Sequence, residues 1–134
     1  MNVNAITDQQ LTGVVEVLRS YEAVEAAYLL GSAATGRLRA DSDIDIAVLP
    51  RHRDPMSVAD RVELTGRLVE VLGRPVDLGI LTTSNVVYAK EAVATGRLIF
   101  ERDHRLTARF AMLALSMYAS LQEARREVLR AYAA

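Results

Sequence analysis

Residues 29–49 read LLGSAATGRLRADSDIDIAVL, and this stretch decides the fold that we expect. An apolar run ends abruptly at Gly31-Ser32, and a second apolar run opens ten residues later with Asp43-Ile44-Asp45. Side chains alternate between the two faces of a strand, so both aspartates would point one way and the isoleucine between them would point into a core. We therefore predict two strands, the second of which carries a pair of carboxylates on one face.

This pattern of residues favours a site for metal ions and phosphate. Two carboxylates on one strand face can share divalent cations such as Mg²⁺, which leave room for substrate phosphates. Gly31 lets a ligand approach the backbone closely, and Ser32 offers an N–H and a hydroxyl to phosphate. A bare Asp-x-Asp is most often a solvated turn that recurs by chance, but the Gly-Ser ahead of it favours the functional interpretation.

Periodicity and capping residues place the other elements. Thr7 and Gln10 form a capping box, and Gly73 and Gly96 are stop signals for two later helices. We expect helices over residues 8–21, 57–72, 86–95 and 106–132, and extended segments over residues 24–30, 43–49, 76–81 and 98–101. We expect Val62, Leu68, Val69 and Leu72 to form the buried side of the second long helix. The predicted fold class is α+β with α/β-type layering: a small mixed sheet of three or four strands flanked by helices, with a long C-terminal helix.

The third expected strand carries one acid, Asp77, on the same face as Gly79. Alone, this aspartate would most simply be an edge residue. If its strand lies beside the strand of Asp43 and Asp45, a third carboxylate completes a site for two metal ions.

At these residues the chain resembles a known family. Gly31-Ser32, ten intervening residues and Asp43-x-Asp45 are similar to the signature of the DNA polymerase beta-like nucleotidyltransferases. The form is that of the minimal nucleotidyltransferases, the MNT type, which are paired with HEPN toxins. Pro75-Val76-Asp77-Leu78 and residues 96–103 (GRLIFERD) also fit the family pattern. Ala33 departs from it, because many relatives carry a larger, often basic residue there.

The resemblance implies an adenylyltransferase antitoxin. ATP would lie with its phosphates on Gly31 and Ser32, while Asp43, Asp45 and Asp77 hold two Mg²⁺ ions, with Mn²⁺ as an alternative metal. Asp77 would take the proton of the acceptor hydroxyl, which we expect to be a tyrosine of a HEPN ribonuclease toxin. The toxin would then be both substrate and partner in a hetero-oligomer.

Two other functions remain open at the level of sequence. One is nucleotidyl transfer to a small hydroxylated molecule such as an aminoglycoside, with a homodimer building the pocket. The other is a non-catalytic antitoxin that neutralises its toxin by binding alone.

Composition narrows the classes of chemistry, binding partner and cellular location that remain open. The 134 residues include no cysteine, which excludes disulfides and thiolate chemistry. The 16 basic and 17 acidic residues offer no basic excess, so we expect no direct nucleic-acid binding. The N-terminal residues MNVNAITDQQ do not resemble a signal peptide, and no apolar run is long enough for a membrane span. A cytoplasmic protein is therefore expected.

We expect one domain with two parts, a nucleotidyltransferase core over residues 1–104 and a C-terminal helix over residues 105–134. Apolar residues recur along that helix every three or four positions: Leu106, Phe110, Leu113, Met117, Leu121, Ala124 and Val128. At 1.5 Å per residue its roughly 27 residues would span about 40 Å, more than a small domain needs. The far half is either a solvated tail or a docking surface for a partner.

Overall fold

The computed structural model describes residues 5–51 and 56–133. In chain order the elements are α1 (Asp8–Arg19), β1 (Val24–Leu29), α2 (Gly31–Thr35), β2 (Ile44–Pro50), α3 (Val58–Leu72), β3 (Val76–Ile80), α4 (Val86–Thr95), β4 (Arg97–Glu101) and α5 (His104–Ala133). These agree with the expected elements to within one or two residues at nearly every boundary. His52, in the charged sequence segment that follows β2, lies outside the described residues.

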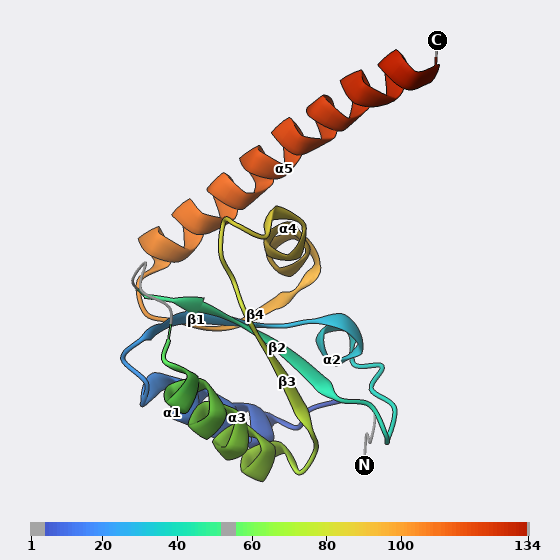
Figure 1. Ribbon diagram of the computed structural model, residues 1–134. Coiled ribbons are helices and arrows are strands. Elements are labelled where there is room, and N and C mark those ends of the chain that lie inside the picture. The colour runs from blue at the N-terminus through green and yellow to red at the C-terminus, as the bar shows by residue number, and fades with distance from the viewer. Residues whose placement is uncertain (1–4, 52–55, 134) are drawn as a thin grey trace.

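A four-stranded mixed sheet in the order β3-β2-β1-β4 forms the middle of the molecule (Figure 1). β1 pairs antiparallel with β2 and with β4, whereas β2 and β3 run parallel. The parallel pair follows from chain connectivity, because α3 crosses from the end of β2 back to the start of β3. This confirms the predicted fold class and brings the starts of β2 and β3 to the same end of the sheet.

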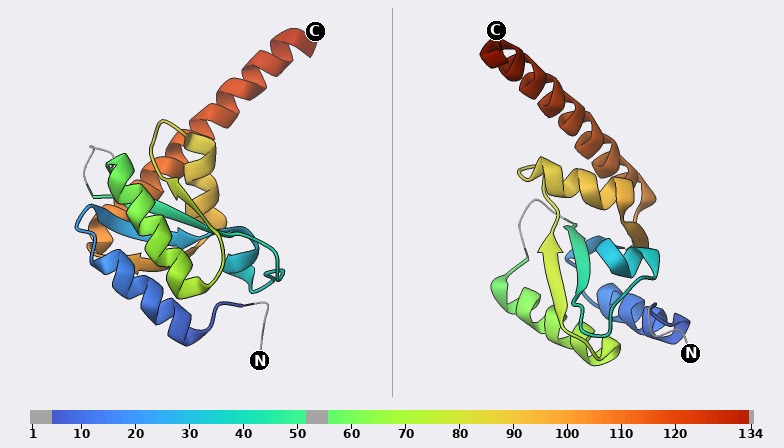
Figure 2. Two further views of the ribbon diagram at one scale, coloured as in Figure 1. Left: turned by 60° about the horizontal axis from the view of Figure 1, so that its bottom comes forward. Right: turned by 90° about the vertical axis from the view of Figure 1, so that its right-hand side faces the viewer.

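Helices cover both faces of the sheet (Figure 2). α1 and α3 lie on one face, where Ile44, Ile46 and Val48 of β2 enter the larger core. α4 and the first half of α5 lie on the other face, where Ala47 and Leu49 enter a smaller core. The face of β2 that begins with the two aspartates is therefore polar only at its start and becomes buried two residues later.

Capping residues set the helix ends where the sequence predicted them. The capping box of α1 is complete, with Gln10 N donating to Thr7 Oγ1 over 3.1 Å and Thr7 N donating to Gln10 Oε1 over 3.0 Å. α3 ends at Gly73, whose φ of 67° is left-handed and suits glycine. The predicted buried side of α3 was partly wrong. Val62 is 68% exposed, and the fully buried Leu64 takes its place, because packing on the sheet selects the Leu64–Leu68–Leu72 stripe.

α5 leaves the domain and projects away from it (Figures 1 and 2). It begins at His104, two residues earlier than expected, because the Asp103 carboxylate accepts from Arg105 N over 2.9 Å and caps the first turn. Thr107 and Ala114 are buried against the domain, but residues 123–133 are all exposed. Within the described residues, no helix is both long and apolar enough to cross a membrane.

A set of polar contacts around Glu25 and Arg102 fixes the start of α5. Glu25 is 2% exposed, and its Oε2 accepts from the backbone N–H groups of Arg102 and Asp103 over 3.1 and 2.8 Å. The Arg102 guanidinium in turn donates to four carbonyls that close α1 and open β1: Arg19 O over 2.6 Å, Tyr21 O over 2.8 Å, Val24 O over 2.7 Å and, more weakly, Leu18 O over 3.5 Å. Residues 101–104 are therefore held against the far end of the α1–β1 turn.

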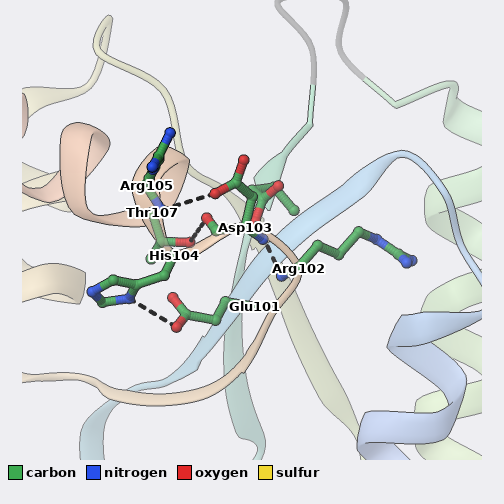
Figure 3. Close-up of polar contacts among 7 residues, drawn as sticks. Glu101, Arg102, Asp103, His104, Arg105 and Thr107 are labelled. Carbon is green, nitrogen blue, oxygen red and sulfur yellow. Dashed lines mark hydrogen bonds and ion pairs between the residues drawn. The ribbon is translucent and has the colours of Figure 1, made fainter.

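His104 follows Asp103, but the pair is structural and does not form a metal site. Figure 3 shows the His104 ring turned toward Glu101, with Nδ1 2.9 Å from Glu101 Oε1, while Asp103 faces the first turn of α5. The GRLIFERD segment that fits the family pattern thus supports the fold at the start of α5.

Candidate active site

The three predicted carboxylates come from the adjacent starts of two parallel strands. Asp45 and Asp77 are register partners across β2 and β3. Asp43 stands one residue ahead of β2. Asp45 is partly buried, whereas Asp43 and Asp77 are exposed. The structure therefore brings Asp77 beside the Asp-x-Asp pair, which the sequence could only assume.

The electrostatics of Asp45 reflect this crowding of acids. The pKa of the Asp45 carboxyl is raised, first by burial and then by the negative charges of Asp77, Asp43 and Glu91. Burial and like charges both disfavour the ionised carboxylate. This end of the sheet consequently carries more negative charge than the surrounding protein neutralises.

The donor set fits a divalent cation in its chemistry, although the side chains do not converge as they stand. Among residues 5–51 and 56–133, no group of three or more His, Cys, Asp or Glu side chains is arranged so that it could hold a metal ion. Asp43 and Asp77 are exposed, so a change of rotamer is open to both. Hard oxygen ligands with surplus negative charge are what Mg²⁺ prefers. Whether Asp43, Asp45 and Asp77 act together as ligands therefore stays a prediction.

Gly31 lies directly beside Asp45, and Ser32 follows it in the first turn of α2. Gly31 has a left-handed φ of 58°, and a Cβ added to it would lie 3.6 Å from Asp45 Oδ2. The backbone at this turn is tied to the acidic strand, since Leu30 N donates to Asp45 O over 3.0 Å. The predicted phosphate-binding turn therefore lies next to Asp45, one of the three predicted metal ligands. Ala33, the departure from the family pattern, is 5% exposed and packs into the larger core.

Two residues of α4 face the acids and were missed by sequence reasoning. Tyr88 has a raised pKa, caused first by burial and then by the charges of Asp77, Asp45 and Glu91. Glu91 also contributes to the raised pKa of Asp45. No local pattern marks these residues, because only the packing of α4 over the sheet brings them to the site.

Comparison with known proteins decides the family. Residues 13–105 match the family model described as polymerase beta, nucleotidyltransferase. The chain belongs to this nucleotidyltransferase family. The matched segment contains Gly31-Ser32, Asp43, Asp45 and Asp77, on which the predicted resemblance rested.

Two curated nucleotidyltransferases are similar to this chain. The protein adenylyltransferase MntA of Shewanella oneidensis is 32% identical over 119 residues, which cover 87% of this chain and 82% of that protein. A spectinomycin 9-adenylyltransferase of Campylobacter jejuni is 31% identical over 96 residues, which cover 65% of this chain but only 36% of that enzyme.

Solved structures of toxin–antitoxin complexes share the fold of this nucleotidyltransferase. One, a toxin–antitoxin with AMP-PNP, aligns with a TM-score of 0.75 and 30% identity over 92% of this chain and 98% of the matched chain. Another is the MNT antitoxin of Shewanella oneidensis in complex with a tri-AMPylated HEPN toxin. It aligns with a TM-score of 0.70 and 28% identity over 93% of this chain and 97% of the matched chain.

Proposed function

We propose that this nucleotidyltransferase is the antitoxin of a HEPN/MNT toxin–antitoxin pair. It moves AMP from ATP to a tyrosine hydroxyl of the HEPN toxin and so silences the toxin. The observation that carries the proposal is the nearly full-length match, in sequence and in fold, to MntA and to antitoxins solved with an AMPylated toxin or with AMP-PNP. An ATP-dependent enzyme with an intracellular ribonuclease as its partner would work in the cytoplasm.

Each residue of the site has a role in this proposal. Gly31 and Ser32 bind the β- and γ-phosphates of ATP, because the left-handed glycine leaves the backbone open beside Asp45. Asp43, Asp45 and Asp77 hold two Mg²⁺ ions. When bound, these ions supply charge neutralisation on the attacking and leaving oxygens.

Asp77 is the residue that takes the acceptor's proton. It lies at the exposed edge strand β3, where an incoming hydroxyl can reach it, whereas Asp45 is partly buried. As the tyrosine oxygen forms its bond to the α-phosphorus, the bond to pyrophosphate breaks and the phenolic proton passes to Asp77. Asp43 and Asp45 would remain ligands of the metal ions while Asp77 takes the proton.

The division of the chain into a catalytic core (residues 1–104) and a docking helix (residues 105–134) belongs to the same proposal. Residues 123–133 of α5 are all exposed in the described structure, and among them Val128 is 55%, Leu129 67% and Tyr132 87% exposed. A helical end without tertiary contacts is only marginally stable in water. We therefore place the toxin against this part of α5.

The small-molecule alternative has one observation in its favour, the similarity to the spectinomycin enzyme. That match spans only about a third of the enzyme, whereas the match to MntA spans most of both proteins. The greater coverage of the match to MntA therefore favours a protein as the acceptor of AMP. The contact-only antitoxin is weakened by the retention of Gly31, Ser32 and all three acids in one site.

Intact-mass spectrometry of the toxin tests the proposal directly. The toxin encoded beside this protein is incubated with the antitoxin, ATP and Mg²⁺, and in parallel with the Asp43→Ala/Asp45→Ala variant. We expect the toxin to gain one or more AMP units with the wild-type protein only, and peptide mapping to place them on tyrosine.

The other outcomes separate the alternatives. If neither protein changes the toxin mass but both neutralise it in a tight complex, the antitoxin acts by contact alone. If the two proteins do not bind at all, adenylylation of a hydroxylated small molecule becomes the better hypothesis, and spectinomycin is the first compound to assay.

A further inference from the structure

A recess lies next to the acid pair on the same face of the sheet. The register that pairs Asp45 with Asp77 pairs Ala47 with Gly79 two residues further along β2 and β3. Both positions lie on the carboxylate face, since side chains two residues apart share a face. Because alanine has a small side chain and glycine has none, the surface of the sheet is recessed at this point.

The side chain of Tyr88 fills that recess from α4. A Cβ added at Gly79 would overlap Tyr88 Oη and would lie 2.7 Å from Tyr88 Cζ. The phenol end therefore rests directly on the backbone of Gly79. The backbone position of Tyr88 is fixed as well, because the side chain of Asn85, the N-cap of α4, accepts a hydrogen bond from Tyr88 N over 3.3 Å.

The hydroxyl that reaches this position is a donor without a partner. Tyr88 Oη makes no hydrogen bond with any other residue in the described part of the chain. A tyrosine hydroxyl has an ordinary pKa of about 10, so Tyr88 Oη keeps its proton at neutral pH. The charges of Asp77 and Asp45 are near enough to influence it. A protonated phenol beside two carboxylates is placed to donate to one of them.

Asp77 is the carboxylate that needs such a donor. It is exposed on the edge strand β3, and within residues 5–51 and 56–133 its side chain makes no hydrogen bond. A carboxylate that binds a metal ion depends on hydrogen bonds from a second layer of residues for its orientation. Asp45 is partly buried, so its side chain already has less conformational freedom and depends less on an orienting hydrogen bond.

We propose that Tyr88 is a positioning residue whose hydroxyl donates a hydrogen bond to the Asp77 carboxylate in the loaded site, and that Gly79 is required to admit it. This inference rests on the proposed role of Asp77 as a metal ligand and proton acceptor. It adds a residue of α4 to a site that is otherwise built from β2, β3 and the turn at Gly31.

Metal binding provides a test that does not depend on turnover. Mn²⁺ binding in the presence of AMP-PNP is followed by electron paramagnetic resonance for the wild-type protein, Tyr88→Phe and a matched control, Tyr118→Phe. The control loses a tyrosine hydroxyl on α5 that accepts from Gln122 Nε2 over 2.8 Å. We expect Tyr88→Phe to weaken Mn²⁺ binding about 10-fold or more, as is typical for loss of a second-layer partner, and Tyr118→Phe to bind like wild type.

Kinetics of toxin adenylylation supply a second readout. A positioning role predicts that Tyr88→Phe lowers kcat by about 10–100-fold while KM for ATP changes by less than about twofold. A merely structural role would instead lower the melting temperature and leave kcat of the folded fraction unchanged. Gly79→Ala, which expels the phenol from its recess, should reproduce the Tyr88→Phe defect in Mn²⁺ binding.

The outcomes distinguish this inference from the proposed function. If the wild-type protein binds Mn²⁺ and adenylylates the toxin but Tyr88→Phe matches it in both assays, the positioning role is overturned and the proposed function stands. If the wild-type protein does not modify the toxin, the proposed function fails, but the Mn²⁺ comparison still decides the role of Tyr88. If the wild-type protein binds no Mn²⁺, Asp77 holds no metal and the inference falls with it.

Discussion

Asp45 on β2 and Asp77 on β3 stand opposite each other on neighbouring parallel strands, with Asp43 one residue ahead of the first strand. Like charges that face each other across neighbouring strands repel and are destabilising. The pKa of Asp45 is raised first by burial and then by the charges of Asp77, Asp43 and Glu91. The closely placed acids are therefore expected to lower the stability of the free protein.

Replacement of Asp45 should stabilise the protein that it inactivates. Asp45→Asn removes a charge that burial and three neighbouring acids disfavour, so we expect the melting temperature at pH 7 to rise by roughly 1–4 °C. A raised folded-state pKa means that the destabilisation is present above that pKa and disappears as the pH falls to the unfolded value of 3.8. The gain from Asp45→Asn should therefore shrink as the pH is lowered toward 4.

Differential scanning calorimetry between pH 4 and pH 8 measures this effect. Asp41→Asn, at an exposed position in the loop before β2, is the matched control and should leave the melting temperature nearly unchanged. A lower melting temperature for Asp45→Asn at pH 7 would show that its carboxylate has a stabilising partner.

Gly31→Ala tests the turn that we assign to phosphate. An L-residue at a φ of 58° is strained, so we expect a loss of about 1–2 kcal/mol in the free energy of unfolding and weaker binding of AMP-PNP. Gly66→Ala is the matched comparison, for which we expect a stabilising effect. Gly66 lies within α3 with no atom within 4 Å of an added Cβ, so alanine should stabilise the protein by about 0.5–1 kcal/mol. Urea denaturation and calorimetric titration of AMP-PNP measure both effects, and equal effects of the two substitutions would contradict the assignment.

Arg102 should be more important for stability than its exposed position suggests. Arg102→Ala removes the donor for the carbonyls of Arg19, Tyr21 and Val24, and we expect a loss of about 1.5–3 kcal/mol in urea denaturation. Arg105→Ala, an exposed arginine three residues later on α5, should cost little. Equal losses for the two variants would mean that the contacts of Arg102 contribute nothing.

A matched pair of valines tests the docking role of α5. Val128→Lys and Val62→Lys make the same substitution at exposed sites on α5 and α3, where wild-type valine is 55% and 68% exposed. Neither should change the melting temperature appreciably. We expect only Val128→Lys to weaken toxin binding, by about tenfold or more, since a charge would be buried in an apolar contact. Surface plasmon resonance with immobilised toxin measures this, and unchanged binding by Val128→Lys would move the toxin interface elsewhere.

Local signals explain why most of the fold was predictable. The capping box at Thr7 and Gln10 and the left-handed glycine at Gly73 act within a few residues of the chain, so they can be recognised without any tertiary contact. Packing is less local. Val62 and Leu64 lie on different sides of one helix, and only the sheet beneath α3 selects Leu64 for the core.

The residues of the candidate site also divide into those that local sequence predicted and those that only tertiary structure places. Gly31, Ser32, Asp43 and Asp45 fall within fifteen consecutive residues, so strand alternation, the Gly-Ser turn and the resemblance to a family signature together predicted one site. Asp77 could be recognised as an acid on a strand, but its place beside Asp45 depends on the parallel register of β2 and β3.

Tyr88 carried no signal in the sequence. Its place beside the acids depends on the packing of α4 over the sheet and on the space left by Gly79. Sequence therefore identified Gly31, Ser32 and the three aspartates of the predicted site and the segments that carry them. Only the tertiary structure decided which of those groups meet, because contacts between distant segments arise from packing and register, and these are properties of the whole folded chain.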